Sequence, residues 1–282
     1  MSPIGISINA AFARHENNPS VDAIEQARRQ GYEFFEPSLT TGPALLAHDG
    51  YYHFLTLEQE PEEVRAWLAA AGLKPSGVTV RAPLMRPDVC VPYMHQAIHY
   101  AAALGAPLVT TDEGCKPAWM SEETAWEMMR YSLRLIARSA ERSGVSIAIA
   151  SRGTYTSRIE GLLRMMELVP SPWLRISFDT GKTLLADVDP GRVLKQVVEK
   201  VIHVHAQDVT FHTDIGRDGR ISRTLVGCAC GDGLVDWRQI IDILDSTGYT
   251  GVLSVQCKTV SEAERSILYL RQLLQHTLIG HH

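Results

Sequence analysis

Short apolar runs alternate with amphipathic stretches along the whole chain of 282 residues. Most of the apolar runs are continuous, which is typical of strands that are covered on both faces, as in parallel sheets. The pattern predicts eight strands, at Ile4–Ile8, Tyr32–Glu36, Gly77–Val80, Pro107–Thr111, Val145–Ala150, Leu174–Phe178, Val201–His205 and Val252–Gln256. It predicts eight helices between and after them, near Ser20–Gln30, Pro61–Ala71, Pro92–Leu104, Ser121–Ser143, Ser157–Leu168, Pro190–Glu199, Asp236–Ser246 and Ser261–Leu274.

Local signals support the predicted helix ends. Ser121 and Ser261 each place a hydroxyl at the start of a helix, with acidic residues in the first turn, and both features stabilise a helix N-terminus. A glycine follows several helices just before the next strand, where a left-handed residue lets the chain leave the helix. These glycines are Gly31, Gly72, Gly105, Gly144 and Gly248.

Eight βα units in one unbroken series predict an α/β protein with a single (β/α)8 TIM barrel over residues 1–282, a fold of typically about 250 residues. The length alone would also fit two average domains, but no Ser- or Pro-rich linker divides the chain. A doubly wound sheet is the alternative from the same pattern. It is less favoured because no Gly-rich phosphate loop follows the first strand.

Composition and net charge limit the classes of binding partner that we expect. The ordinary shares of hydrophobic and charged residues argue against a disordered or fibrous chain. The formal charge of −5 gives no general attraction to phosphate backbones, so no nucleic-acid partner is expected. No apolar stretch reaches about 18 residues, so no membrane span is expected. The absence of a recognisable leader and the five sparse cysteines favour the reducing cytoplasm.

In a TIM barrel the active site lies on the loops that follow the carboxyl ends of the strands. This rule selects the candidate site residues from the predicted strand ends. They are Asn9, Glu36, Arg81, Asp112, Glu113, Ala150, Ser151, Arg152, Asp179, Lys182, His205, Asp208, Gln256 and Lys258.

Five segments in the second half of the chain resemble strands five to eight of xylose isomerase-like barrels. They are GVSIAIASRG at 144–153, SPWLRISFDTG at 171–181, HVHAQD at 203–208 (similar to HxHxKD), GDGLVDW at 231–237 (similar to GEGxVDW) and GVLSVQ at 251–256. The chain therefore resembles the sugar phosphate isomerase/epimerase superfamily, which also contains tagatose and psicose 3-epimerases, inosose dehydratase and endonuclease IV. The resemblance implies the barrel fold and a small-molecule substrate. Relatives often form dimers or tetramers, which leaves a homo-oligomer open.

The resemblance also implies one divalent metal, held by a Glu, an Asp, a His and a Glu at the ends of strands five to eight. Asp179 and His205 match two of these positions, but Ala150 and Gln256 stand at the two glutamate positions. An ion left with Asp179, His205 and the neutral amide of Gln256 would be weakly held. We therefore expect no cofactor, with one weakly bound divalent metal (Mn, Mg, Co or Zn) as the alternative.

Further departures introduce cations. Ser151 and Arg152 replace the family's Asn/His pair, Lys182 replaces a His, and Thr156 replaces the second glutamate of the epimerases. Two cationic residues, Arg152 and Lys182, are thus present in a site that has lost two carboxylates. Such cations can stabilise an oxyanion or bind an anionic group of a substrate.

We therefore assign Asp179, His205 and Lys182 as catalytic residues and Arg152, Glu36, Gln256 and Ser151 as substrate-binding residues. The structural alternatives are a loop-holding carboxylate for Asp179, a core imidazole for His205 and a solvated lysine for Lys182. His203, two residues before His205 on the same strand face, is expected to be structural.

The function expected from these residues is a sugar or polyol isomerase, epimerase or dehydratase that acts on a small hydroxy-carbonyl or anionic carbohydrate-derived substrate. The alternative is a non-catalytic ligand-binding or partner subunit on the same barrel, supported by the loss of two ligands. An abasic-site endonuclease is disfavoured, because the segment after Phe178 lacks the His that a multinuclear zinc cluster needs. The long segments 38–50 and 208–234 are expected to be lids or interface elements.

Overall fold

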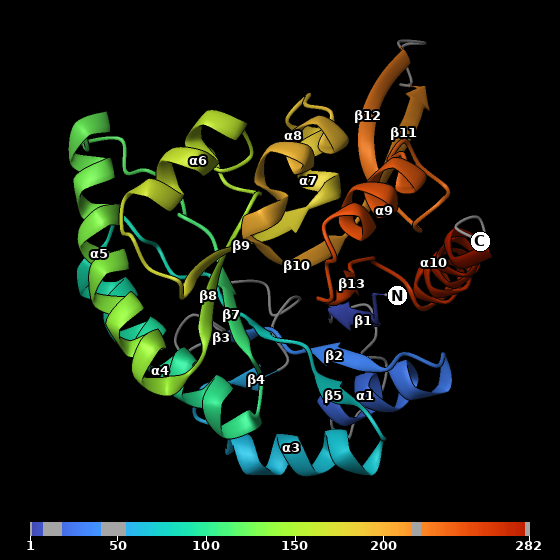
Figure 1. Cartoon of the computed structure of the whole chain (residues 1–282), viewed down its shortest axis with the longest axis horizontal. Helices are drawn as coiled ribbons and strands as arrows, with labels where there is room; N and C mark the ends of the chain where they lie inside the picture. Colours follow the sequence, from blue (N-terminus) through green and yellow to red (C-terminus); the bar gives the residue numbers. More distant parts are fainter. Residues whose placement is uncertain (1, 8–18, 41–54, 216–220, 280–282) are drawn as a thin grey trace.

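The computed structural model describes residues 2–7, 19–40, 55–215 and 221–279. Its central feature is a parallel sheet that curves into a barrel, with helices around the outside (Figure 1). The order of strands in this sheet is β5 (Lys74–Pro75), β2 (Phe34–Glu36), β1 (Ile4–Ser7), β13 (Leu253–Val255), β10 (Val201–Ala206), β9 (Leu174–Asp179), β8 (Ser146–Ala150), β7 (Leu108–Thr111) and β6 (Val78–Thr79). Every pairing within it is parallel.

The barrel closes at its third strand, which is split into two short pieces. Residues 74–75 pair with β2, while residues 78–79 pair with β7. A parallel bridge between Ser38 and Thr79, and a hydrogen bond from the Thr79 amide to the Pro37 carbonyl, join the two edges. The predicted (β/α)8 fold class is thereby confirmed. That residues 1–282 form one domain stays a prediction.

In the part of the chain that the structure describes, eight helices follow the order that the sequence pattern predicts, and one further short helix, Thr180–Leu185, was not predicted. In chain order the helices are α1 (Pro19–Arg29), α3 (Pro61–Ala70), α4 (Pro87–Leu104), α5 (Glu122–Ser143), α6 (Ile159–Glu167), α7 (Thr180–Leu185), α8 (Pro190–Val197), α9 (Trp237–Ser246) and α10 (Val260–Ile279). A 3₁₀ turn, Val198–Lys200, follows α8. Within the described residues, no helix is both long and apolar enough to cross a membrane.

Most of the predicted helix ends are confirmed. The Ser121 hydroxyl accepts a hydrogen bond from the Thr124 amide at 3.1 Å, and all five predicted glycines have positive φ. The cap of α10 is Thr259 rather than Ser261, because the Thr259 hydroxyl and the Glu262 carboxylate accept each other's backbone amides.

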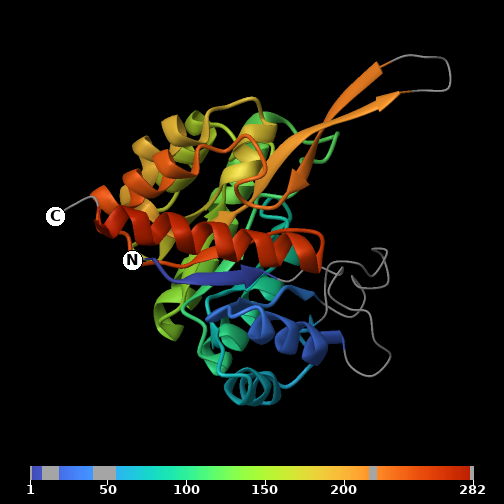
Figure 2. The same cartoon turned by 90° about the vertical axis from the view of Figure 1, so that its right-hand side faces the viewer.

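The segment after β10, expected to be a lid or interface element, contains two regular strands that the sequence pattern did not predict. It forms an antiparallel hairpin of β11 (Asp208–Ile215) and β12 (Ile221–Cys228), which projects away from the body of the barrel (Figure 2). A period-two alternation of Val209, Phe211 and Ile215 in the sequence is its local signal. The segment after β2 continues as β3 (Leu39–Thr40), which pairs with β4 (Leu55–Thr56). The rest of that predicted lid, residues 41–50, and Asn9 lie outside the described residues.

Buried apolar side chains fill the space between the sheet and the helices, as the continuous apolar runs predict. Several buried polar residues lie near the carboxyl ends of the strands. Glu36, His203, His205, Asp179 and Ser254 are all fully buried. Burying five polar side chains is costly unless each finds partners, so this end of the barrel is the place to look for a site.

Candidate active site

Strand register brings the candidate side chains to one level of the barrel. His205 on β10 pairs with Asp179 on β9 and with Ser254 on β13. On the other side of β13, Ser7 of β1 pairs with Glu36 of β2. Glu36, Asp179 and His205, predicted from strands far apart in sequence, thus lie at the same end of the barrel.

Glu36 is the centre of a buried hydrogen-bond network. The Thr79 hydroxyl donates to its Oε1 at 2.5 Å, and the Ser254 hydroxyl donates to its Oε2 at 2.6 Å. His203 Nε2 lies 2.9 Å from Oε2, and His205 Nε2 lies 2.9 Å from Oε1. Because an ionised carboxylate only accepts hydrogen bonds, both imidazoles act as donors here.

The network controls the ionisation of Glu36. Complete burial on its own would raise the pKa of this carboxyl, but the charge interactions and hydrogen bonds of His205 and His203 outweigh it and hold the pKa well below the usual range. The carboxylate is therefore ionised and fully satisfied. This arrangement orients His205 but gives Glu36 no free oxygen with which to contact a substrate.

Asp179 differs from Glu36 because it is only partly satisfied. Its Oδ1 accepts the Lys182 amide at 2.8 Å and caps α7, while its own amide donates to the Ser151 hydroxyl at 2.8 Å. Its Oδ2 is buried and has no hydrogen-bond partner among the described residues. Burial raises the pKa of this carboxyl, although His205, the Lys182 amide and the charges of Arg152 and Lys182 oppose the increase.

Arg152 enters the site from the turn after β8. Its side chain is only 8% exposed, and its Nε donates to Asp112 Oδ2 at 2.8 Å. Its Nη2 is buried and, within the described residues, has no acceptor. A buried guanidinium nitrogen and a buried carboxylate oxygen, on Arg152 and Asp179, thus both lack partners at this end of the barrel.

The other predicted residues take varied places. Ser151 is buried and fixes the Asp179 backbone, as described above. Lys182 contributes its amide to that carboxyl while its side chain is exposed. Gln256 is half-buried just after β13, and Ala150 is fully buried at the end of β8. Asp208 serves a structural role: its carboxylate accepts four hydrogen bonds, from Val209, Gly231, Val235 and Trp237.

Sequence reasoning missed several partners in the site. Thr79 and Ser254 donate to Glu36, Asp112 binds Arg152, and His203 shares Glu36 with His205. The available signal was a polar residue within an apolar strand, which does not reveal the partner. The two cations expected in the site do not both act as free charges there. The charge of Arg152 is compensated by Asp112, and the side chain of Lys182 is exposed.

Among the described residues, Glu36, His203 and His205 form the group of metal-capable side chains whose ligand atoms lie within 4.8 Å of one another. One carboxylate and two imidazoles are suitable donors for a divalent metal such as Zn²⁺. Their surroundings fit a metal poorly. The Glu36 carboxylate already accepts two hydroxyls and two imidazoles, and buried His203 Nδ1 has no described partner, whereas a metal-bound histidine normally donates its second N–H.

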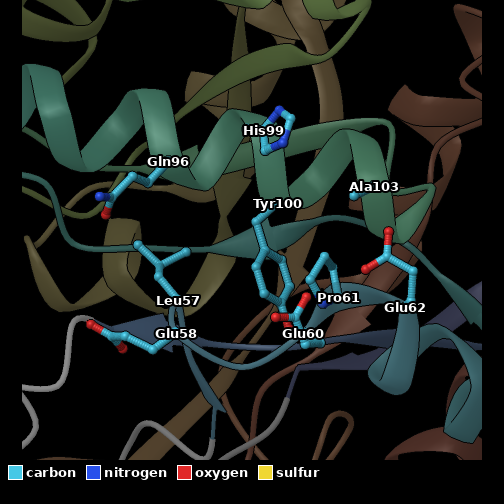
Figure 3. Close-up of a pocket in the computed structure, with 9 residues that line it drawn as sticks. All are labelled: Leu57, Glu58, Glu60, Pro61, Glu62, Gln96, His99, Tyr100 and Ala103. Atoms are coloured by element: carbon cyan, nitrogen blue, oxygen red, sulfur yellow. The ribbon is translucent and has the colours of Figure 1, made fainter.

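A separate surface pocket of about 420 Å³ lies between the segment Leu57–Glu62 and helix α4 (Figure 3). Glu58, Glu60 and Glu62 surround it, and the ring of Tyr100 points from α4 toward this segment. None of the predicted catalytic or substrate-binding residues lines this pocket. The candidate active site is therefore the polar end of the barrel.

Comparison with known proteins agrees with the fold. The family model described as "Xylose isomerase-like TIM barrel" matches residues 24–274. The chain belongs to the xylose isomerase-like TIM barrel family. The match spans the buried network, the Arg152 turn and Asp179.

Individual curated relatives show low sequence identity to this chain and match only part of it. An inosose dehydratase from Geobacillus thermodenitrificans (strain NG80-2) is 25% identical over 172 residues, which cover 57% of this chain and 57% of that protein. An inosose dehydratase from Clostridium perfringens (strain 13 / Type A) is 26% identical over 148 residues, or 50% of each chain. This xylose isomerase-like chain thus spans about half the length of the curated relatives it matches.

Solved structures match nearly the whole length of the chain. A D-tagatose 3-epimerase-like protein superimposes with a TM-score of 0.75 at 18% identity, covering 99% of this chain and 100% of that one. An L-ribulose 3-epimerase gives a TM-score of 0.74 at 16% identity, covering 99% and 97%. At these identities the likeness establishes the fold.

Proposed function

We propose that this xylose isomerase-like protein is an enzyme that isomerises, epimerises or dehydrates a small polyhydroxylated carbonyl compound. The observation that carries the proposal is the pair of buried, unpartnered atoms, Asp179 Oδ2 and Arg152 Nη2. A ligand hydroxyl or carbonyl supplies what both atoms lack, because a hydroxyl donates to a carboxylate and either oxygen accepts from a guanidinium. The named activities of the dehydratase and epimerase relatives support this class of reaction.

Charge favours a hydroxy-carbonyl substrate over an anionic one. Asp112 already pairs with Arg152, so the charge of Arg152 is compensated and does not balance a carboxylate on the substrate. An anion placed here would also meet Asp179. A neutral sugar, ketose or keto-polyol satisfies the two unpartnered atoms without adding charge.

In the proposed mechanism, Asp179 removes a proton from the carbon next to the substrate carbonyl. Its raised pKa makes it a stronger base than an ordinary carboxylate. The Arg152 guanidinium stabilises the enediolate oxygen that forms. His205, held by Glu36, lies opposite Asp179 on the neighbouring strand and favours the ionised form of its carboxyl. Lys182, Ser151 and Gln256 are proposed to contact the ligand.

We further propose that the reaction proceeds without a bound divalent metal. Ala150 and Gln256 supply no carboxylate, one oxygen of Asp179 caps α7, and His205 Nε2 is engaged by Glu36.

Five free cysteines are consistent with a reducing compartment such as the cytoplasm.

The test is proton exchange. The protein is incubated in D₂O with a panel of ketoses and keto-inositols, and NMR records deuterium at the carbon next to the carbonyl, which isomerases, epimerases and dehydratases of this mechanism all exchange. We expect exchange with the wild type and a loss of about 10²- to 10⁴-fold in Asp179→Asn. Asp242→Asn, which changes an exposed aspartate on α9, is the matched control.

The alternative function is a ligand-binding subunit without catalysis, which the loss of carboxylates at Ala150 and Gln256 favours. The same panel separates the two. Saturable binding by calorimetry with no deuterium incorporation for any compound supports the binding subunit, and equal exchange in wild type and Asp179→Asn contradicts the proposed base.

A further inference from the structure

Glu113 is a fully buried carboxylate that the proposed reaction does not use. It follows β7 directly after Asp112. Its Oε1 accepts the Tyr155 amide at 2.7 Å and the Thr156 amide at 3.2 Å, and its Oε2 accepts the Thr156 hydroxyl at 2.7 Å. All three donors belong to the turn that follows β8, so one side chain from β7 holds the turn of the neighbouring strand.

The turn is shaped to receive this carboxylate. A Cβ on Gly153 would lie 2.1 Å from both oxygens of Glu113, so a residue with a side chain at position 153 would displace either the Glu113 carboxylate or the turn. The Gly153 amide donates to the Thr156 hydroxyl oxygen at 3.1 Å, and this oxygen also lies 2.8 Å from the Ala150 carbonyl. The turn is thereby tied both to Glu113 and to the end of its own strand.

Arg152 lies at the start of the same turn. Asp112 binds its Nε, while the adjacent Glu113 binds the backbone three and four residues further on. Two consecutive acids thus fix the guanidinium and the turn that carries it. Glu113 is saturated by these donors, so it is not available as a base.

We propose that Glu113 is a positioning residue, which holds the turn from Arg152 to Thr156 so that Arg152 Nη2 faces the ligand beside Asp179. The ligand-facing part of this inference rests on the proposed function. The clamp itself rests only on the contacts of Glu113.

The clamp is tested first by limited trypsin digestion. Trypsin must bind the arginine side chain before it cleaves, and the Arg152 side chain is only 8% exposed, so we expect cleavage between Arg152 and Gly153 to require opening of the turn. Wild type, Glu113→Gln and the control Glu123→Gln, an exposed glutamate on α5, are digested well below their unfolding temperatures and mapped by mass spectrometry. We expect cleavage at this bond to be at least about tenfold faster in Glu113→Gln and unchanged in the control. Equal rates in all three proteins overturn the clamp.

If Glu113→Gln does not fold, Thr156→Val replaces it, since it removes only the hydroxyl, which meets Glu113 Oε2, the Gly153 amide and the Ala150 carbonyl. We expect a smaller increase in cleavage at the same bond. A wild-type rate in this variant equally overturns the inference.

The exchange assay then tests the positioning role. We expect kcat/KM per folded protein to fall about tenfold in Glu113→Gln, with KM raised and kcat lowered, because a misplaced Arg152 holds both the bound carbonyl and the enediolate oxygen less well. A merely structural role would reduce kcat only in proportion to the folded fraction, at constant KM, and that result overturns the positioning role while leaving the proposed function standing. If no compound undergoes exchange in the wild type, the proposed function fails, and the trypsin assay alone decides the clamp.

Discussion

His205 Nε2 lies 2.9 Å from Glu36 Oε1, and this contact joins β10 to β2 through the interior of the barrel. The two residues are 169 positions apart in sequence. Both are fully buried, so the contact is shielded from solvent, and its loss would leave a buried group without its partner. This pair, with Thr79, Ser254 and His203 around it, is the polar core on which the candidate site is built.

Replacing Glu36 with Gln is expected to destabilise the protein by about 3 kcal/mol, because the amide retains one acceptor oxygen and presents an NH₂ group to donors. Urea unfolding at pH 7 measures this loss. Glu33→Gln, at an exposed position on the same segment, is the matched control and should remain close to wild type.

The Glu36 network also predicts an acid dependence of stability. The pKa of Glu36 is lowered in the fold, so its contribution is complete above the usual value of 4.5 and is lost as the pH falls through the lower, folded value. Wild type should therefore lose more of its free energy of unfolding than Glu36→Gln on acidification below that usual value. Parallel curves for the two proteins would contradict an ionised, hydrogen-bonded Glu36.

Asp179→Asn should have the opposite effect on stability. The pKa of Asp179 is raised in the fold, chiefly by burial, so the ionised form costs stability, and this cost grows as the pH rises from the usual 3.8 through the folded value. Asparagine can still cap α7 through its oxygen and removes the charge. We expect a higher unfolding temperature at pH 7 together with lost exchange activity, and a difference that narrows toward acid pH. A variant less stable than wild type at pH 7 would show that the charge of Asp179 is compensated.

The metal-free proposal predicts that chelation leaves wild-type exchange unchanged. It also predicts that Ala150→Glu combined with Gln256→Glu creates affinity for Mn²⁺, because carboxylates then stand at the two positions where the resemblance places them beside Asp179 and His205. Titration calorimetry and elemental analysis of the dialysed proteins measure binding, and the single variant Gln256→Glu is the control. Activity that disappears with EDTA and returns with Mn²⁺ would refute the proposal for the wild type.

The sequence pattern predicted the barrel well because its signals are local. Apolar runs located β8 and β9 to within one residue, since strands covered on both faces need continuous apolar side chains. The hairpin was missed because its outer part has polar, exposed side chains such as His212 and Asp214, so that the alternation of Val209 and Phe211 was too weak to stand out.

The sequence predicted which strand ends meet but not the contacts between their side chains, and the roles assigned to the site residues stay predictions. The rule that barrel strands end at one face brought Glu36, Asp179 and His205 together. The pairing of Glu36 with Ser254 spans 218 residues, and that of Arg152 with Asp112 spans 40. Such contacts depend on register and loop geometry, which no local pattern encodes, so the compensation of Arg152 and the unpartnered oxygen of Asp179 required the structure.

Asp208 provides a test of the distinction between structural and functional residues at the strand ends. Its Oδ1 accepts the amides of Val209 and Val235, and its Oδ2 accepts the amide of Gly231 and the indole N–H of Trp237. Asp208→Asn turns an NH₂ group toward two of these donors, so we expect a loss of about 2 to 3 kcal/mol in the free energy of unfolding. Denaturant unfolding followed by tryptophan fluorescence measures it, with Asp245→Asn, an exposed aspartate at the end of α9, as the control. Because Asp208 has no free oxygen for a ligand, the folded variant should keep its KM in the exchange assay, and a large rise in KM at unchanged stability would instead place Asp208 in the substrate site.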